Sequence, residues 1–140
     1  MTAEALPGAA TPLRILLVDD FQPFRKTIER MLKPIPSLSL IGEAADGLSA
    51  VEMALTLHPD IIIMDVQMPE LDGIEATRRI KRALPQTCVI GMSALDHAMI
   101  NDAMLEAGAS AFVAKYCAVT LPQVIEKITG RRLGDFEAAS

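Results

Sequence analysis

The sequence predicts an α/β fold, in which a doubly wound parallel sheet of five strands carries five helices on its two faces. From residue 14 onward, short runs rich in Ile, Val and Leu alternate with longer segments of helical period. Each pair of segments occupies about 25 residues, a usual length for a βα unit. Several of the short runs are apolar without alternation, which is typical of parallel strands covered on both faces. Repeated units of this kind form right-handed crossovers and hence a doubly wound sheet.

Five short segments, rich in Ile, Val and Leu, are expected to be the strands. They are residues 14–19, 38–44, 60–65, 88–93 and 110–115. The expected strand order is 2-1-3-4-5, the order of the flavodoxin-like sheets that this pattern resembles. In that order the first and third strands are neighbours, and ligands bind beyond the carboxyl ends of the strands.

The helices are recognised by their apolar stripes and by their ends. In the first helix one side is apolar, with Phe24, Ile28, Met31 and Leu32, and the other is expected to be solvated, with Arg25, Lys26, Glu29 and Arg30. The last helix repeats the spacing with Leu121, Val124, Ile125 and Ile128. Three helices are expected to stop at Pro34, Pro59 and Pro85. The expected N-caps are Asp20, Asp46, Asp72 and Thr120.

Composition narrows the class of protein. The chain has 140 residues, 51% of them apolar and 22% charged, which suits one globular domain. Its net charge of -5 argues against binding to nucleic acid or to an anionic membrane, because both require a basic face. The apolar runs are all shorter than the ~20 residues that cross a bilayer. An excess of carboxylates instead suits a cation site.

The ends of the chain differ in composition from its centre. We expect residues 1–12 to be a flexible leader, residues 13–130 the folded domain and residues 131–140 a C-terminal tail. The first residues lack the basic start and apolar core of a signal peptide. Two cysteines, Cys88 and Cys117, are too few for a disulfide framework. These features favour the cytoplasm, a reducing compartment.

Chemically active side chains gather at the carboxyl ends of the expected strands. Asp19 and Asp20 end the first strand, Asp65 the third, Ser93 the fourth and Lys115 the fifth. Singly, each is also typical of a turn, a cap or a solvated strand end. Together they occupy one edge of the sheet, where neighbouring strands lie about 4.8 Å apart. This shared edge favours a functional site.

The expected acidic cluster suits Mg²⁺ as its cofactor. Three crowded carboxylates repel one another unless a cation neutralises them. A site with few carboxylates, no His and open positions for water and phosphate is typical of Mg²⁺. With the metal and the Lys115 ammonium to neutralise a transferring phosphoryl group, one carboxylate can act as the nucleophile, and the central Asp65 is the candidate.

Four stretches of the sequence resemble the response-regulator receiver domains of bacterial two-component signalling. They are LRILLVDD, DIIIMDVQMPELDG, MSA and GASAFVAK, which lie in order within residues 13–129. The resemblance implies that Asp65 accepts a phosphoryl group from the phosphohistidine of a sensor kinase or phosphotransfer protein. It also implies that Asp20, Asp65 and the backbone carbonyl of Gln67 bind Mg²⁺ directly, with Asp19 acting largely through water.

The resemblance further implies a switch. Lys115 is expected to pair with a phosphoryl oxygen, and the Ser93 hydroxyl to move toward the phosphoryl group with help from the Ala94 N–H. Phe112 is expected to turn inward when the hydroxyl moves, although it is equally typical of a core residue. The Met-rich helix at 95–107, the fifth strand and the last helix are then the output face for a downstream target, an output domain or a homodimer partner.

The sequence departs from the family at Tyr116, where many receivers have a proline. A cis bond before a residue other than proline costs ~3 kcal/mol, so we expect a trans Lys115–Tyr116 bond and a differently shaped loop. Loss of this proline is common in receivers attached to helix-turn-helix output domains. No such domain follows the last helix within the 140 residues.

Three other functions compete with the switch. A degenerate receiver would act only as a protein interaction module, which the filled key positions disfavour. A phosphatase of the haloacid dehalogenase type needs an Asp two residues after its nucleophile, where this chain has Gln67. A flavin or nucleotide binder needs a phosphate-binding loop, and the loop after the first strand is DDFQPF. We therefore expect a phosphoacceptor and not a multiple-turnover enzyme.

Overall fold

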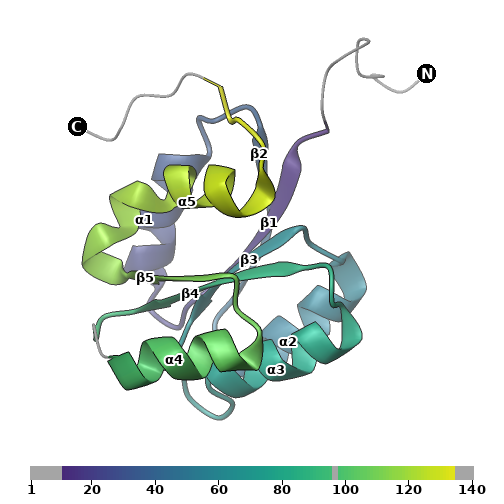
Figure 1. Cartoon of the computed structure of the whole chain (residues 1–140), viewed down its shortest axis with the longest axis vertical. Coiled ribbons are helices and arrows are strands. Elements are labelled where there is room, and N and C mark those ends of the chain that lie inside the picture. Colours follow the sequence, from purple (N-terminus) through teal and green to yellow (C-terminus); the bar gives the residue numbers. More distant parts are fainter. Residues whose placement is uncertain (1–10, 96–97, 135–140) are drawn as a thin grey trace.

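The computed structural model describes residues 11–95 and 98–134, which form alternating strands and helices (Figure 1). The strands are β1 (Leu13–Val18), β2 (Leu38–Ala44), β3 (Ile61–Asp65), β4 (Cys88–Ser93) and β5 (Ala111–Ala114). The α-helices are α1 (Gln22–Leu32), α2 (Gly47–Leu57), α3 (Gly73–Ala83), α4 (Ala98–Ala107) and α5 (Leu121–Thr129). A 3₁₀ segment, η1 (Lys115–Thr120), joins β5 to α5.

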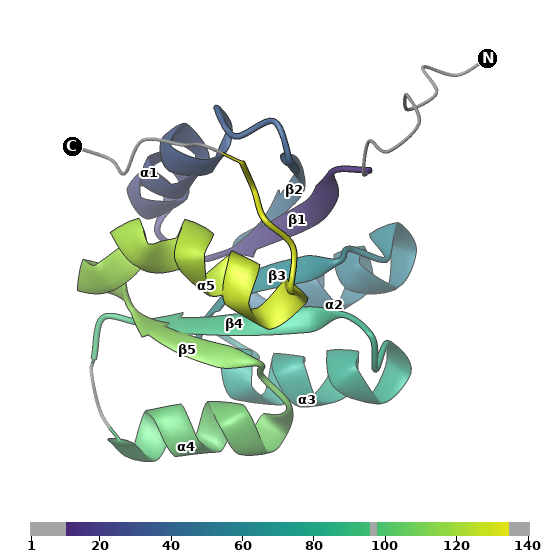
Figure 2. The same cartoon turned by 45° about the horizontal axis from the view of Figure 1, so that its top comes forward.

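The five strands form one parallel sheet in the order β2-β1-β3-β4-β5. Helices α1 and α5 cover one face, and α2, α3 and α4 cover the other (Figures 1 and 2). The predicted fold class and strand order are thus confirmed. Between β1 and β4 lies β3, so the carboxyl ends of these three strands meet at the centre of one edge.

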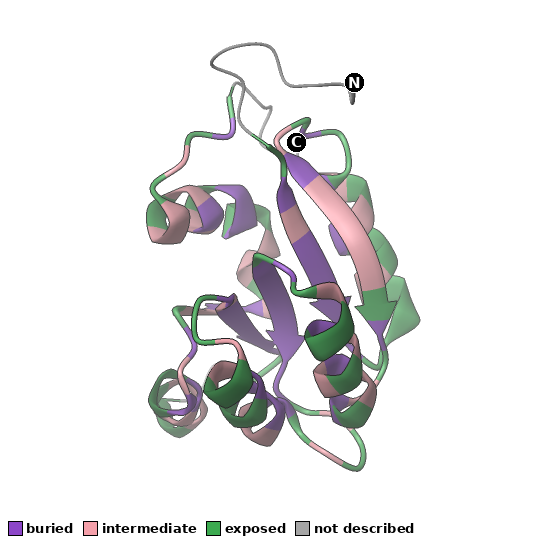
Figure 3. Cartoon of the chain, turned by 90° about the vertical axis from the view of Figure 1, so that its right-hand side faces the viewer, coloured by how far each residue is buried: buried purple, intermediate pink, exposed green. Residues whose placement is uncertain are grey.

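Two apolar clusters fill the space between the sheet and its two layers of helices. Because side chains alternate along a strand, Ile61 and Ile63 enter the cluster under α1 and α5, while Ile62 and Met64 enter the cluster under α2, α3 and α4. All five residues of β3 are buried. Figure 3 shows this pattern, with buried central strands and helices that expose their outer sides. The double coverage explains why these strands read as continuous apolar runs.

Helix starts agree with the sequence at two positions and differ at two. Asp46 accepts a hydrogen bond from the Ser49 N–H at 2.7 Å, and Asp72 accepts one from the Glu75 N–H at 2.9 Å, so both cap their helices as predicted. The predicted cap by Asp20 was wrong, since Phe21 occupies the N-cap position of α1 without a side-chain bond. Asp19 instead orders the turn before α1, because its Oδ1 accepts a hydrogen bond from the Phe21 N–H at 2.8 Å.

Thr120 occupies the N-cap position of α5 as predicted, but its side chain makes no capping hydrogen bond. Its hydroxyl donates to the Cys117 carbonyl at 2.7 Å instead of accepting from an N–H of α5. Its φ and ψ of -84° and -2° are already helical, because η1 runs directly into α5. The first turn of α5 is therefore preceded by a 3₁₀ turn and not by the extended residue that side-chain capping requires.

The packed chain extends past residue 130, where the sequence placed the end of the domain. Leu133 is 2% exposed and belongs to the cluster under α1 and α5. Its N–H donates to Glu126 Oε2 at 2.8 Å, and its carbonyl accepts from the Ser37 hydroxyl at 3.0 Å. The expected leader up to residue 10 and the expected tail from residue 135 lie outside the described residues. Within the described part of the chain, no helix is long and apolar enough to cross a membrane.

Candidate functional site

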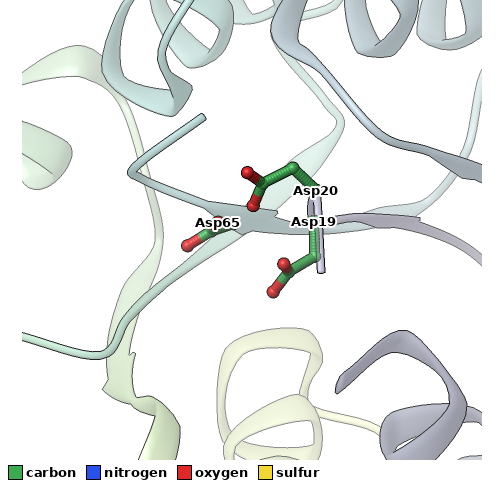
Figure 4. A group of neighbouring side chains, drawn as sticks. All are labelled: Asp19, Asp20 and Asp65. Carbon is green, nitrogen blue, oxygen red and sulfur yellow. The ribbon is translucent and has the colours of Figure 1, made fainter. Parts of the chain in front are cut away.

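Three carboxylates meet at the carboxyl edge of the sheet. Asp19 and Asp20 follow β1 directly, and Asp65 is the last residue of the neighbouring strand β3. One oxygen from each carboxylate lies within 4.8 Å of the other two (Figure 4). Asp19 and Asp65 are each 4% exposed, whereas Asp20 is exposed. The cluster thus has a buried floor and one side that is open to solvent.

Lys115 brings a positive charge to this cluster from the end of β5. Its Nζ lies 2.6 Å from Asp19 Oδ2 and 3.5 Å from Asp65 Oδ1. The same Nζ lies 4.6 Å from the centre of the Phe24 ring on α1. Because the cluster has three carboxylates and Lys115 supplies one positive charge, the cluster keeps a net negative charge when all three carboxylates are ionised.

The environment of Asp65 raises the pKa of its carboxyl group from 3.8 to about 6. Burial is the largest cause, and the nearby charge of Asp19 is the next. Lys115 lowers the pKa of Asp65, but it does not offset these two effects. The ionised cluster is therefore electrostatically costly without a further cation.

The donor set fits a hard divalent cation. The three candidate ligands are all carboxylates, and oxygen atoms are the ligands that Mg²⁺ prefers. Exposed Asp20 leaves room for water beside the buried pair. Repulsion among the carboxylates, which the raised pKa of Asp65 reflects, is relieved by a positive charge at this place. The residues present thus fit Mg²⁺.

Gly73 lets α3 begin directly against the end of β3. A Cβ at this position would lie 2.1 Å from the backbone oxygen of Asp65, so any side chain would displace the strand end or the helix. The Gly73 N–H donates to the Val66 carbonyl at 2.8 Å. The glycine thus permits the close start of α3, and this close start fixes the backbone of Asp65.

Ser93 and Phe112 lie on the strands beside Asp65. Ser93 ends β4, is fully buried, and accepts a hydrogen bond at its Oγ from the Leu95 N–H at 3.0 Å. Phe112 is half-buried and packs against the cluster under α2, α3 and α4. A Cβ at Gly91 would lie 2.6 Å from the terminal methyl of Met104 and 3.3 Å from Phe112 Cδ1, so the glycine makes room for both side chains.

The two residues expected to act through their backbones lie in loops at the same edge. Ala94 follows β4, Gln67 lies two residues beyond Asp65, and both are exposed. In the described residues no peptide bond is cis, so the Lys115–Tyr116 bond is trans as predicted. The 3₁₀ segment η1 occupies this loop, and Tyr116 is 70% exposed.

Two residues of α1 take part in the site although sequence reasoning missed them. Arg25 was assigned to the solvated side of the helix, but its side chain is 14% exposed. Its Nη1 donates to the Asp19 backbone carbonyl, and its Nε lies 2.7 Å from Glu43 Oε1. Phe24 was assigned to the core alone, yet its ring faces Lys115. Both residues lie about one helical turn after Asp19 and Asp20, and this spacing could have indicated that their side chains reach the acidic edge.

The fold and the edge geometry together define a class: a doubly wound α/β domain with an acidic cluster at its switch point. A family model for the response regulator receiver domain matches residues 15–128. The chain therefore belongs to the receiver domains of two-component response regulators, whose general role is that of a phosphorylation switch.

Several known proteins are similar to this chain. A protein-glutamate methylesterase/protein-glutamine glutaminase of Alkalilimnicola ehrlichii is 46% identical over 105 residues, which are 74% of this chain and 27% of the relative. The response regulator GacA of Pseudomonas viridiflava is 36% identical over 74% of this chain and 48% of its own.

A solved two-component response regulator of the LuxR family from Aurantimonas superposes with a TM-score of 0.81. It is 33% identical, and the match covers 87% of this chain and 89% of the solved one. By contrast, this chain spans from 27% to 48% of the length of the first curated relatives.

Proposed function

We propose that this domain is a signalling switch in which Asp65 accepts a phosphoryl group from a phosphohistidine. The observation that carries the proposal is the environment of Asp65. This buried carboxylate lies at the open edge of the sheet, within reach of two other carboxylates and 3.5 Å from the Lys115 ammonium. Such a group can act as a nucleophile once neighbouring positive charge offsets that of the incoming phosphoryl group.

The transfer would form one bond and break one. A carboxylate oxygen of Asp65 attacks phosphorus, and the bond from phosphorus to the histidine nitrogen breaks, with its electron pair going to the imidazole. The product is an acyl phosphate on Asp65. The donor would be a sensor histidine kinase or a histidine phosphotransfer protein, which places the domain in the cytoplasm with its partner.

Mg²⁺ would be held by Asp20, Asp65 and the backbone carbonyl of Gln67, with Asp19 acting through water. When bound, the metal would neutralise charge on the phosphoryl oxygens and on the carboxylates. Lys115 would supply the second positive charge by turning from Asp19 toward a phosphoryl oxygen. The bond from Asp19 Oδ1 to the Phe21 N–H would keep Asp19 in place during this change.

The switch would begin at Ser93. Its Oγ accepts from the Leu95 N–H, and it would leave this bond to donate to the phosphoryl group, which the Ala94 N–H would also bind. The backbone at Leu95 and the half-buried Phe112 ring would then rearrange. The surface formed by α4, β5 and α5, where Met99 is 73% exposed, would carry the change to an output domain, a target or a second copy.

The test is to incubate the protein with Mg²⁺ and acetyl phosphate or phosphoramidate and to measure its intact mass. We expect a gain of one phosphoryl group that EDTA prevents and that Asp65→Asn abolishes. Failure of every donor would favour an interaction module without phosphorylation. Rapid turnover of the small donor would favour a phosphatase, against the expectation from Gln67, which cannot act as a general acid.

A further inference from the structure

The Phe24 ring is an unassigned neighbour of the proposed phosphorylation chemistry. It lies in the first turns of α1 and is half-buried against the cluster under α1 and α5. Together with Asp19 and Asp65 it lines one small cavity beneath the acidic edge. The Lys115 Nζ lies 4.6 Å from the ring centre, within the range in which a cation is attracted to an aromatic face. The ring thus faces the ammonium from a different element than the carboxylates do.

This ring offers Lys115 an attraction that differs in kind from that of the carboxylates. An ammonium has three N–H donors, and a contact with a π face leaves those donors available for oxygen atoms. The attraction of Asp19 and Asp65 changes whenever a carboxylate binds a proton, a metal or a phosphoryl group. The charge distribution of the phenyl ring stays the same in all of these states. The Lys115 side chain is 18% exposed, so water only partly screens the interaction.

We propose that Phe24 is a positioning residue, whose ring keeps the Lys115 ammonium at the acidic edge while the ammonium exchanges Asp19 for a phosphoryl oxygen. The role of Lys115 in this step rests on the proposed function. Without the ring, the long side chain, which leaves β5 at the start of η1, would visit positions away from the site. Phosphorylation would then slow although all of the carboxylates remain in place.

The first test needs no phosphorylation. A proton near the face of a phenyl ring resonates upfield, so the ε-methylene signals of Lys115 should be shifted upfield in the NMR spectrum of the metal-free protein. Phe24→Leu should abolish this shift, and Phe24→Tyr should keep it. Unchanged Lys115 signals in Phe24→Leu would overturn the proposal.

The second test measures phosphorylation by acetyl phosphate with Mg²⁺. Phe24→Leu should lower the rate constant by about three- to tenfold, and Phe24→Tyr should stay within about twofold of the wild type. Progressive fluorination of the ring at position 24 withdraws electron density at nearly constant volume and should lower the rate step by step. Met31→Leu, which changes the same helix face against the same cluster, is the matched control and should leave the rate unchanged.

The outcomes separate a positioning role from a packing role. A rate that is insensitive to fluorination, or an equal loss in Phe24→Tyr and Phe24→Leu, would show that the ring acts only through packing and would overturn the proposal. If the wild type took up no phosphate from any donor, the proposed function would fail. The NMR comparison would then still decide whether Phe24 positions Lys115.

Discussion

Lys115 Nζ lies 2.6 Å from Asp19 Oδ2, so an ion pair joins the ends of β1 and β5 at the acidic edge. These strands are not neighbours in the sheet, since β3 and β4 lie between them. The lysine is closer to Asp19 than to Asp65, the proposed acceptor. The ammonium therefore stabilises the buried neighbour of the proposed acceptor, and the proposed phosphorylation requires it to turn toward the phosphoryl group.

Replacement of this lysine should destabilise the metal-free protein. In Lys115→Met the buried Asp19 carboxylate loses its cation. Because the Lys115 side chain is 18% exposed, we expect the free energy of unfolding to fall by about 1–3 kcal/mol, less than the ~3–5 kcal/mol for a fully buried pair. Mg²⁺ should restore more stability to the variant than to the wild type, because the ammonium no longer competes with the metal. Urea unfolding with EDTA and with Mg²⁺ measures both effects. Equal unfolding curves in EDTA would contradict this interpretation of the ion pair.

Asp65 should oppose folding at neutral pH in the absence of metal. The pKa of this carboxyl group rises from its ordinary value of 3.8 to about 6 in the folded protein, so the folded state binds a proton more tightly than the unfolded chain. The cost is absent below pH 3.8, grows as the pH rises to 6, and is complete above that value. A difference of about two pKa units corresponds to about 3 kcal/mol at most.

Asp65→Asn removes this cost and should stabilise the metal-free protein at pH 7.5 by about 1–3 kcal/mol. The advantage over the wild type should shrink toward zero as the pH is lowered to 4. Urea unfolding of both proteins in EDTA across this range makes the comparison. A difference in stability that stays constant with pH would argue against a raised pKa of Asp65.

Asp20 should be needed for metal binding but not for folding. It is exposed, yet one of its oxygens lies within 4.8 Å of those of Asp19 and Asp65. Asp20→Asn should weaken Mg²⁺ binding by about tenfold or more and leave thermal stability in EDTA nearly unchanged. The matched control is Asp46→Asn, since Asn can also cap α2 and Asp46 lies outside the cluster. Equal Mg²⁺ affinity of the two variants, measured by calorimetry, would remove Asp20 from the metal site.

Gly73→Ala should displace the backbone of Asp65, although the two residues are eight positions apart in the sequence. The new Cβ would lie 2.1 Å from the Asp65 carbonyl, a backbone atom, so β3 or α3 must shift. We expect a loss of about 2–4 kcal/mol in stability. In the comparison variant, Gly42→Ala, the nearest atom is the terminal methyl of Met53 at 2.8 Å, which can move at lower cost. If chemical denaturation showed the two variants to be equally stable, the close start of α3 would not constrain Asp65.

The strand ends of this domain were predictable because parallel topology places them at one edge. Because Asp19, Asp65 and Lys115 each follow an apolar run, the sequence was enough to assign all three to the carboxyl edge of the sheet. Side-chain direction was not predictable in the same way. Helical period placed Arg25 toward solvent, but its long side chain turns back to the Asp19 carbonyl and to Glu43. Periodicity describes the Cβ direction and not the end of a flexible side chain.

The sequence placed the end of the folded domain at residue 130, because periodicity does not show how a single residue after a helix packs. α5 ends at Thr129, and its C-cap residue Gly130 has a φ of 71°, so the helical period stops there. Leu133 follows as a single apolar residue without a pattern to mark it, yet it fills the cluster beside Ser37 and Glu126. A lone apolar residue after a helix does not reveal whether it packs back onto the core.

The most direct test of the central claim is to locate the phosphoryl group. After incubation with Mg²⁺ and acetyl phosphate, reduction with borohydride converts an aspartyl phosphate to homoserine, which peptide mass spectrometry identifies by position. We predict homoserine at position 65 in the wild type, and no homoserine in Asp65→Asn or in protein treated with EDTA. Homoserine at another aspartate, or a phosphorylated protein that yields none, would contradict the assignment of Asp65 as the acceptor.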